Sequence, residues 1–227
     1  MKMITYNLAR SKRKTMAIYI RPDVTVEVRA PLKVAKADID KFVASKEKWI
    51  KEKLRLVEEK SEKRAVFSLD YGSKVLFKGK EYPIVERPGN LAGFDDECFY
   101  LPPGLAGEQI KNTCIQIYKM LGKQLLTAKT GKYSQLMGVD SLAVKINSAK
   151  TRWGSCSSRK NINYSWRLVM AQDEVIDYVV VHELAHLREM NHSDRFWQIV
   201  AAILPDYQER QKKLKSLQKL LSEQDWS

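Results

Sequence analysis

The chain has 227 residues, and its 40 Lys and Arg against 27 Asp and Glu give a formal charge of +13. Hydrophobic residues make up 44% and charged residues 30%, a balance that is typical of folded globular proteins and excludes the disordered and fibrous classes. No apolar run approaches the ~18 residues of a membrane span, and the polar N-terminus lacks the apolar segment of a signal peptide. We therefore expect a cytoplasmic protein without a membrane partner.

The first part of the chain, residues 1–104, is expected to be β-rich. Short β-branched or alternating runs predict an antiparallel sheet from residues 4–8, 15–20 and 24–29. Apolar residues at near-helical spacing predict one amphipathic helix over 38–63, on which Trp49 is expected to pack inward. Further strands are expected at 74–77, 82–86 and 98–101, and Pro102-Pro103-Gly104 closes this part.

The positive charge is concentrated at the N-terminus. Residues 1–65 hold 18 basic and 9 acidic residues, so this segment alone carries a net charge of +9. Such a segment can bind nucleic acid, because neutralising phosphates releases counterions, and an exposed Trp49 would then stack on a base. The alternative is a solvated, lysine-rich helix that keeps the protein soluble.

The second part, residues 105–227, alternates helices with a few strands. Helices are expected over 108–129, 174–190, 194–204 and 208–221, and strands over 142–146 and 161–168. The chain is therefore expected to be an α+β protein with a domain boundary near Gly104, unless the two parts form one integrated domain.

All the histidines of the chain fall in His182-Glu183-Leu184-Ala185-His186 and at His192. Residues four apart lie on one face of a helix, so the imidazoles of His182 and His186 can bind the same ion. Glu183 is rotated by about 100° from His182 and can reach a water on that ion. This HExxH arrangement predicts a site for one Zn²⁺ per chain, with a third protein ligand and an open position.

The third ligand is expected from the segment that follows. Asn191 tolerates left-handed backbone and is expected to end the helix, so that the chain turns back and brings His192 to the ion. A carboxylate from Glu189 or Glu174 is the alternative third ligand. Cys156 is expected to be a small buried hydrophobe rather than a fourth ligand that would close the site.

A chance origin of this short motif has to be weighed against a metal site. The residues that lead into it, 175–181, are largely apolar, so the polar cluster ends a buried segment. Burying two imidazoles and a carboxylate without a shared partner costs on the order of 1–3 kcal/mol for each unsatisfied group. A bound metal removes that cost, which favours the metal site.

Three segments occur in order along the chain: Arg152-Trp153-Gly154-Ser155-Cys156, then His182 to Leu187, then Asn191-His192-Ser193 with Phe196-Trp197. With these segments the chain resembles the YgjP-like metallopeptidase domain family, which is related to the SprT-like and WLM zinc metalloproteases. The resemblance implies a zincin-like catalytic half, with His182, His186 and His192 as zinc ligands and Glu183 as general base. Glu189 stands where metzincin proteases need a glycine, so we place the chain outside that group.

The leading hypothesis is a zinc metallopeptidase that cleaves protein or peptide substrates with metal-activated water. The oxyanion needs a further donor, for which Arg152, Tyr164 and Tyr178 are the candidates. The strand over 161–168 is expected to form a sheet edge to which an extended peptide adds. Two alternatives remain: a nucleic-acid-associated module with a structural metal, and a small-molecule amidase or esterase using the same site.

Overall fold

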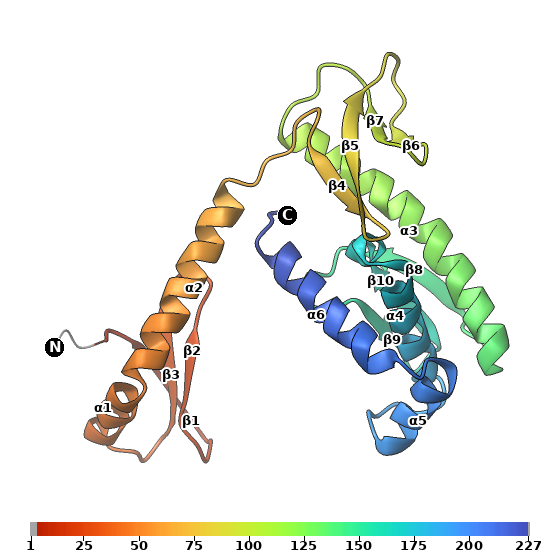
Figure 1. Cartoon of the computed structure of the whole chain (residues 1–227). Helices are drawn as coiled ribbons and strands as arrows, with labels where there is room; N and C mark the ends of the chain where they lie inside the picture. Colours follow the sequence, from red (N-terminus) through yellow and green to blue (C-terminus); the bar gives the residue numbers. More distant parts are fainter. Residues whose placement is uncertain (1–3, 227) are drawn as a thin grey trace. The chain divides into compact units, whose positions relative to one another are not determined.

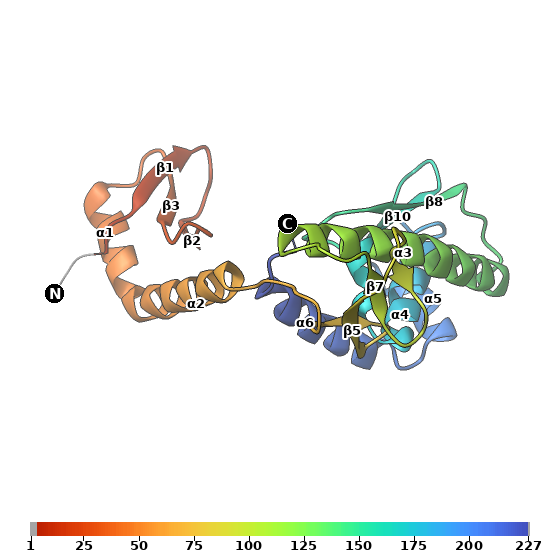
Figure 2. The ribbon, with the colours of Figure 1, turned by 90° about the horizontal axis from the view of Figure 1, so that it is seen from above.

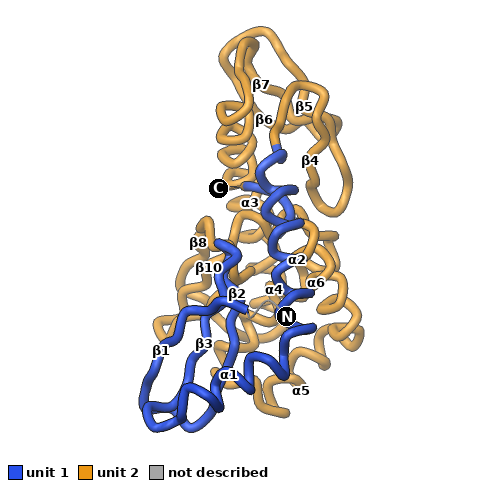
Figure 3. Tube along the Cα trace, turned by 90° about the vertical axis from the view of Figure 1, so that its left-hand side faces the viewer, with its two compact units in different colours: residues 1–67, 221–225, 227 blue, residues 68–220, 226 orange. Residues whose placement is uncertain are grey.

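The computed structural model describes residues 4–226, which form two compact units. The first contains residues 4–67 with 221–225, and the second contains 68–220 with Trp226 (Figure 3). Helices and strands are mixed in both, which confirms the α+β class (Figure 1). Within residues 4–226, no helix is both long and apolar enough to cross a lipid bilayer.

The first unit is built on a three-stranded sheet with the order β1-β3-β2. Its strands are β1 (Asn7–Ser11), β2 (Ala17–Ile20) and β3 (Val26–Pro31). The sheet is mixed rather than antiparallel as expected, because β2 pairs antiparallel with β3 but β1 pairs parallel with it. β3 takes the central place since its alternate residues Val26, Val28 and Ala30 supply the buried face.

Two helices, α1 (Lys36–Ser45) and α2 (Glu47–Ala65), stand where one was expected over 38–63. The break falls at Lys46, whose φ of −108° and ψ of 10° leave helical geometry and whose N–H bonds the Val43 carbonyl at 3.0 Å. This turn keeps Val43 and Ile50 in the core with β3. It leaves Trp49 45% exposed, so the expected inward packing of Trp49 is wrong.

The second unit begins with a four-stranded sheet of order β4-β5-β7-β6. Its strands are β4 (Lys74–Phe77), β5 (Lys80–Glu86), β6 (Gly93–Phe94) and β7 (Phe99–Leu101). Phe99 packs on Tyr118 of helix α3 (Glu108–Met137), and Tyr118 stacks on Trp166, with ring centroids 5.1 and 5.4 Å apart. The boundary expected near Gly104 thus falls inside this unit, and the division of the chain into domains remains a prediction.

A second sheet, of order β8-β10-β9, lies along α3 (Figure 2). It consists of β8 (Ala143–Asn147), β9 (Gly154–Cys156) and β10 (Asn161–Ser165), and the 3-10 helix η1 (Trp166–Met170) follows. β10 pairs parallel with β8 and antiparallel with β9. The expectation that 161–168 form a sheet edge is therefore wrong: β10 is central, and β9, in the segment expected to be a turn, is an edge.

Three helices complete the second unit: α4 (Asp173–Ala185), α5 (Asp194–Ile203) and most of α6 (Tyr207–Ser222). α3 continues past its expected end near residue 129 because Tyr133 and Met137 extend its buried face. It stops at Gly138, whose φ of 59° is the left-handed conformation that glycine adopts without strain. α4 packs against both α3 and β9, so it lies between a helix and a sheet edge.

Candidate metal centre

The end of α4 presents two of the three histidines, His182 in its last turn and His186 at its C-cap. The helix ends at Ala185, short of its expected end near residue 190, where the N–H groups of Leu187 and Arg188 bond the carbonyls three residues earlier, Leu184 and Ala185, both at 3.0 Å, and so tighten the last turn. The Arg188 guanidinium donates to the Met137 carbonyl and thereby holds this turn against the end of α3. Asn191 has no positive φ, so the left-handed helix end expected there is wrong.

The early turn brings three imidazole rings together. One ring nitrogen from each of His182, His186 and His192 lies within 4.8 Å of the others. The Nε2 atoms of His182 and His192 face each other at 3.1 Å, and the three pairs of ring centroids are separated by 5.0, 5.0 and 4.8 Å. The residues expected to be ligands therefore share one small volume, while their role as ligands remains a prediction.

Burial and hydrogen bonding keep the rings of His182 and His186 in the neutral form that binds metals. The Nδ1–H of His186 donates a hydrogen bond to the Glu189 carbonyl at 3.2 Å, so the ring proton is on Nδ1. The lone pair of Nε2 is therefore available to a metal ion. Burial, together with the neighbouring His186 and His192, lowers the pKa of His182 to about 3. Burial also lowers the pKa of His186. Both imidazoles are consequently neutral near neutral pH, as metal ligation requires.

Aromatic residues of α5 support the histidine cluster. The buried ring of Phe196 has its centroid 4.9, 4.6 and 4.8 Å from those of His182, His186 and His192. The neighbouring Trp197 stacks on His192 with an interplanar angle of 24°. Sequence reasoning assigned these two residues no role, although their position directly after His192 was the available signal.

Glu183 lies beside the cluster and against strand β9. Its side chain is 5% exposed, and its Oε2 has no hydrogen-bond partner among the described residues. A Cβ placed on Gly154 would stand 2.5 Å from Glu183 Oε1, so the carboxyl group occupies space that only a glycine leaves. Burial raises the pKa of Glu183 to about 7, and the positive charge of Arg152 opposes that rise. Sequence reasoning did not identify Gly154 as part of the site.

The imidazole nitrogens of His182, His186 and His192 form a set of ligands that fits a divalent metal. Glu183 Oε2 is buried without a partner in the described part of the chain, which is costly unless a water on the ion or another group compensates. The alternative ligands do not join the cluster: Glu174 pairs with Lys213 at 3.0 Å, and the carboxylate of Glu189 lies outside the group of donors. Cys156 is half-buried and also lies outside that group, so nothing in the described chain indicates that it closes the site.

The three candidates for transition-state contacts lie in different environments. Arg152 is exposed and close enough to influence the charge of Glu183. Tyr178 is buried, with its ring 5.9 Å from that of His182, and burial raises its pKa to about 12. Tyr164 is completely buried, and its hydroxyl contacts Thr130 of α3 at 3.2 Å, so the structure places it in the core rather than at the open side of the cluster.

A family model for the YgjP-like metallopeptidase domain matches residues 14–217 of the chain. Two solved structures are similar to parts of it. The metallopeptidase zymogen of Pyrococcus abyssi abylysin is 22% identical, with 40% of this chain and 92% of that chain covered at a TM-score of 0.38. The zymogen of Methanocaldococcus jannaschii jannalysin is 21% identical, with 42% and 96% covered at a TM-score of 0.37. A search of curated proteins gives no match.

Proposed function

Because this chain belongs to the YgjP-like metallopeptidase family, we propose that it is a zinc-dependent peptidase with Glu183 as its general base. One observation carries the proposal: three converging imidazoles lie beside a buried carboxyl group that has no other partner in the described chain. Three imidazoles are a ligand set that zinc uses in catalytic sites. No fourth side chain joins the group among residues 4–226, which favours an open catalytic site over a closed structural one.

Each residue has a distinct task in the proposed reaction. A divalent ion held by His182, His186 and His192 would supply Lewis-acid activation of water and of the scissile carbonyl. Glu183 accepts a proton from the attacking water on its carboxylate and delivers it to the leaving amine. A pKa near 7 suits a group that must both take and give a proton at neutral pH. Arg152, the exposed candidate, is the residue we assign to the developing oxyanion.

The edge strand β9 offers backbone groups to an extended substrate. The N–H of Ser165 bonds the Trp153 carbonyl at 2.8 Å, and that of Ser157 bonds the Asn161 carbonyl at 3.0 Å. Bonded pairs alternate with non-bonded pairs in an antiparallel ladder, so the N–H and carbonyl groups of Gly154 and Cys156 face away from β10. A peptide added there would lie next to Glu183 and be recognised mainly through its main chain.

The substitution Glu183→Gln tests this assignment in the zinc-loaded protein. We expect the variant to retain its metal, measured by elemental analysis, and to lose roughly 10²–10⁴-fold in the cleavage of an unfolded protein. Full activity of the variant, or a wild-type protein that takes up no metal, would refute the proposal. Faster turnover of small amides or esters than of peptides would instead favour the small-molecule hydrolase.

The first unit supports a second candidate function, nucleic-acid binding, through charge alone. Several exposed lysines of this unit have no hydrogen-bond or ion-pair partner in the described chain: Lys12, Lys14, Lys33, Lys41, Lys48 and Lys60. Their free charge favours a polyanion. Affinity for DNA should fall steeply with salt, and reversal of Lys41 and Lys48 to Glu should weaken it. Binding that is absent or independent of salt would leave only the role in solubility.

A further inference from the structure

Strand β2 forms one edge of the sheet in the first unit, with β3 as its partner on the other side. The N–H of Arg21 bonds the Thr25 carbonyl at 2.8 Å, which fixes Arg21 and Thr25 as a hydrogen-bonded pair in the hairpin. Hydrogen-bonded and non-bonded pairs alternate along an antiparallel ladder, so Tyr19 and Glu27 also form a hydrogen-bonded pair. Ile18 and Ile20 belong to the non-bonded pairs between them. The N–H and carbonyl groups of Ile18 and Ile20 therefore face the free edge.

A groove lies beside this edge, on the side of the sheet that faces the helices. It is lined by Ile18, Phe42, Lys46 and Trp49 and has a volume of about 280 Å³. Ile18 is in register with the buried Val28, so its side chain points to this inner side. Trp49 contributes an exposed aromatic surface, and Lys46 has neither an ion-pair nor a hydrogen-bond partner for its side chain among residues 4–226.

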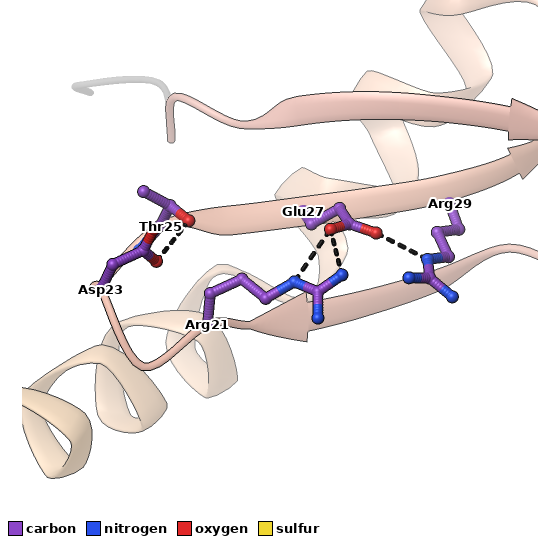
Figure 4. Close-up of polar contacts among 5 residues, drawn as sticks. All are labelled: Arg21, Asp23, Thr25, Glu27 and Arg29. Carbon is purple, nitrogen blue, oxygen red and sulfur yellow. Dashed lines mark hydrogen bonds and ion pairs between the residues drawn. The ribbon is translucent and has the colours of Figure 1, made fainter.

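The opposite side of the same edge is already satisfied. Arg21 and Arg29 both bind the carboxylate of Glu27, which lies between them (Figure 4). The Arg29 guanidinium also lies 4.8 Å from the centre of the Tyr19 ring. The outer side therefore offers little unpaired charge, and the recognition features gather on the inner side with the groove.

We propose that the free edge of β2 and its groove bind an extended, acidic polypeptide segment, which adds to the sheet as a fourth strand. The regularly spaced N–H and carbonyl groups of this edge form hydrogen bonds most completely with the backbone of another extended chain. The edge therefore favours a polypeptide strand over other ligands. A residue placed opposite Ile18 would share its side of the sheet and direct its side chain into the groove against Phe42 and Trp49. Lys46 and the net positive charge of residues 4–67 favour acidic neighbours in that segment.

This inference rests on the proposed function for its purpose, because a site for unfolded polypeptide would recruit substrates to a peptidase. It does not depend on catalysis, since binding can be measured in the metal-free full-length chain. Failure of the two proposals is therefore distinguishable: loss of hydrolysis in Glu183→Gln concerns the metal centre, whereas the experiment below concerns only β2 and its groove.

The probe is fluorescein-labelled, reduced and carboxymethylated lactalbumin, an unfolded acidic polypeptide, added to the metal-free protein. We expect Trp49→Ala to weaken binding at least ~10-fold and Lys46→Glu to weaken it about 3- to 5-fold. The control Leu56→Ala, which alters an exposed residue of α2 outside the groove, should leave binding unchanged. Lys48→Glu, which changes the net charge equally but lies outside the groove, should weaken binding less than Lys46→Glu does. In the wild-type protein, the amides of Ile18 and Ile20 should gain protection from hydrogen exchange when the probe binds, while that of Tyr19 is protected beforehand.

Three results would overturn the inference. One is binding of the probe that is equal in Trp49→Ala and wild type, or no binding at all. Another is protection of Ile18 and Ile20 by a thymidine oligonucleotide instead of the polypeptide, which would make Trp49 a base-stacking residue. The last is protection that rises with protein concentration alone and accompanies a dimer in light scattering, which would assign the edge to a second copy of the chain.

Discussion

The backbone of Gly154 lies against the carboxyl group of Glu183, so that a methyl group on Gly154 would stand 2.5 Å from Oε1 and 2.7 Å from both Cδ and Cγ. Such distances are far below van der Waals contact, and three atoms of one side chain are involved. Because Glu183 is buried against β9 at this point, the side chain cannot simply rotate into solvent. A change at Gly154 must therefore move the proposed base.

We predict that Gly154→Ala lowers kcat by about 10²-fold, since displacement of a reacting group by about 1 Å has effects of that size. The metal content should stay at the wild-type level, because the three atoms nearest to a Cβ on Gly154 all belong to Glu183 and none to a histidine. Steady-state kinetics with a peptide substrate and elemental analysis give both quantities. Cys156→Ala, on the same edge strand, is the control and should retain activity.

A double substitution separates positioning of Glu183 from general damage. If Gly154 acts through Glu183, adding Gly154→Ala to Glu183→Gln should cause no further loss of activity. Fully additive losses in the double variant would show that Gly154→Ala harms the site by another route.

The pKa of Glu183 predicts a pH dependence of stability in the metal-free protein. Its folded-state pKa of about 7 exceeds its ordinary value of 4.5, so between these values the folded chain binds more protons than the unfolded chain. The contribution of Glu183 to the free energy of unfolding is therefore fully present below pH 4.5 and declines by up to about 3 kcal/mol as pH rises to 7.

Urea unfolding of the metal-free protein at several pH values between 4.5 and 8 measures this decline. His182 has the opposite tendency, because its lowered pKa makes stability rise with pH between about 3 and 6.5, so wild type alone shows the sum of the two. The free energy of unfolding of the wild type minus that of Glu183→Gln isolates the contribution of Glu183, and this difference should decrease as pH rises. A difference that does not change with pH would contradict the buried, protonatable carboxyl group.

Removal of the metal should destabilise the wild-type protein but not His192→Ala. Free Zn²⁺ at 100 times its Kd stabilises the folded state by about 2.7 kcal/mol, which thermal unfolding with and without a chelator detects. Because His192 is a proposed ligand, its loss should abolish this increment. Because its side chain is exposed, the metal-free variant should be as stable as the metal-free wild type. His182→Ala, at a mostly buried position, should lower metal-free stability as well. A chelator effect of unchanged size in His192→Ala would exclude this residue as a ligand.

Lys129 links α3 to the start of α4, the helix that carries the proposed base. Its ammonium donates to Asp173 at 2.7 Å and to Asp177 at 2.6 Å, and both Lys129 and Asp177 are largely shielded from water. We predict that Lys129→Met lowers the free energy of unfolding by about 3 kcal/mol, because it leaves Asp177 shielded without its main cationic partner. Lys132→Met, at an exposed position of α3, should change it by less than about 0.5 kcal/mol in the same urea titration. Equal effects of the two would contradict this account.

The local patterns of the sequence predicted the parts of the site that depend on neighbours along the chain. The spacing of His182, Glu183 and His186 on one helix, and the return of His192, are such patterns. The role of Gly154 was not predictable in this way, because it arises from the packing of β9 against α4, which brings Gly154 to Glu183 across about thirty residues of sequence. For the same reason the central position of β10 escaped prediction, since strand composition does not state which strand stands between which others.

Helix α3 runs for 30 residues, about 45 Å, and contacts β7 and η1 as well as β8 and α4. The aromatic cluster around Tyr118 and the turn whose Arg188 bonds the Met137 carbonyl are thus both packed on the same continuous helix. The parts of the second unit that pack on α3 are therefore expected to unfold together, in one cooperative transition. Damage at Tyr118 would then loosen the histidine-bearing turn at the far end, so that an inactivating substitution need not lie anywhere near the reacting atoms.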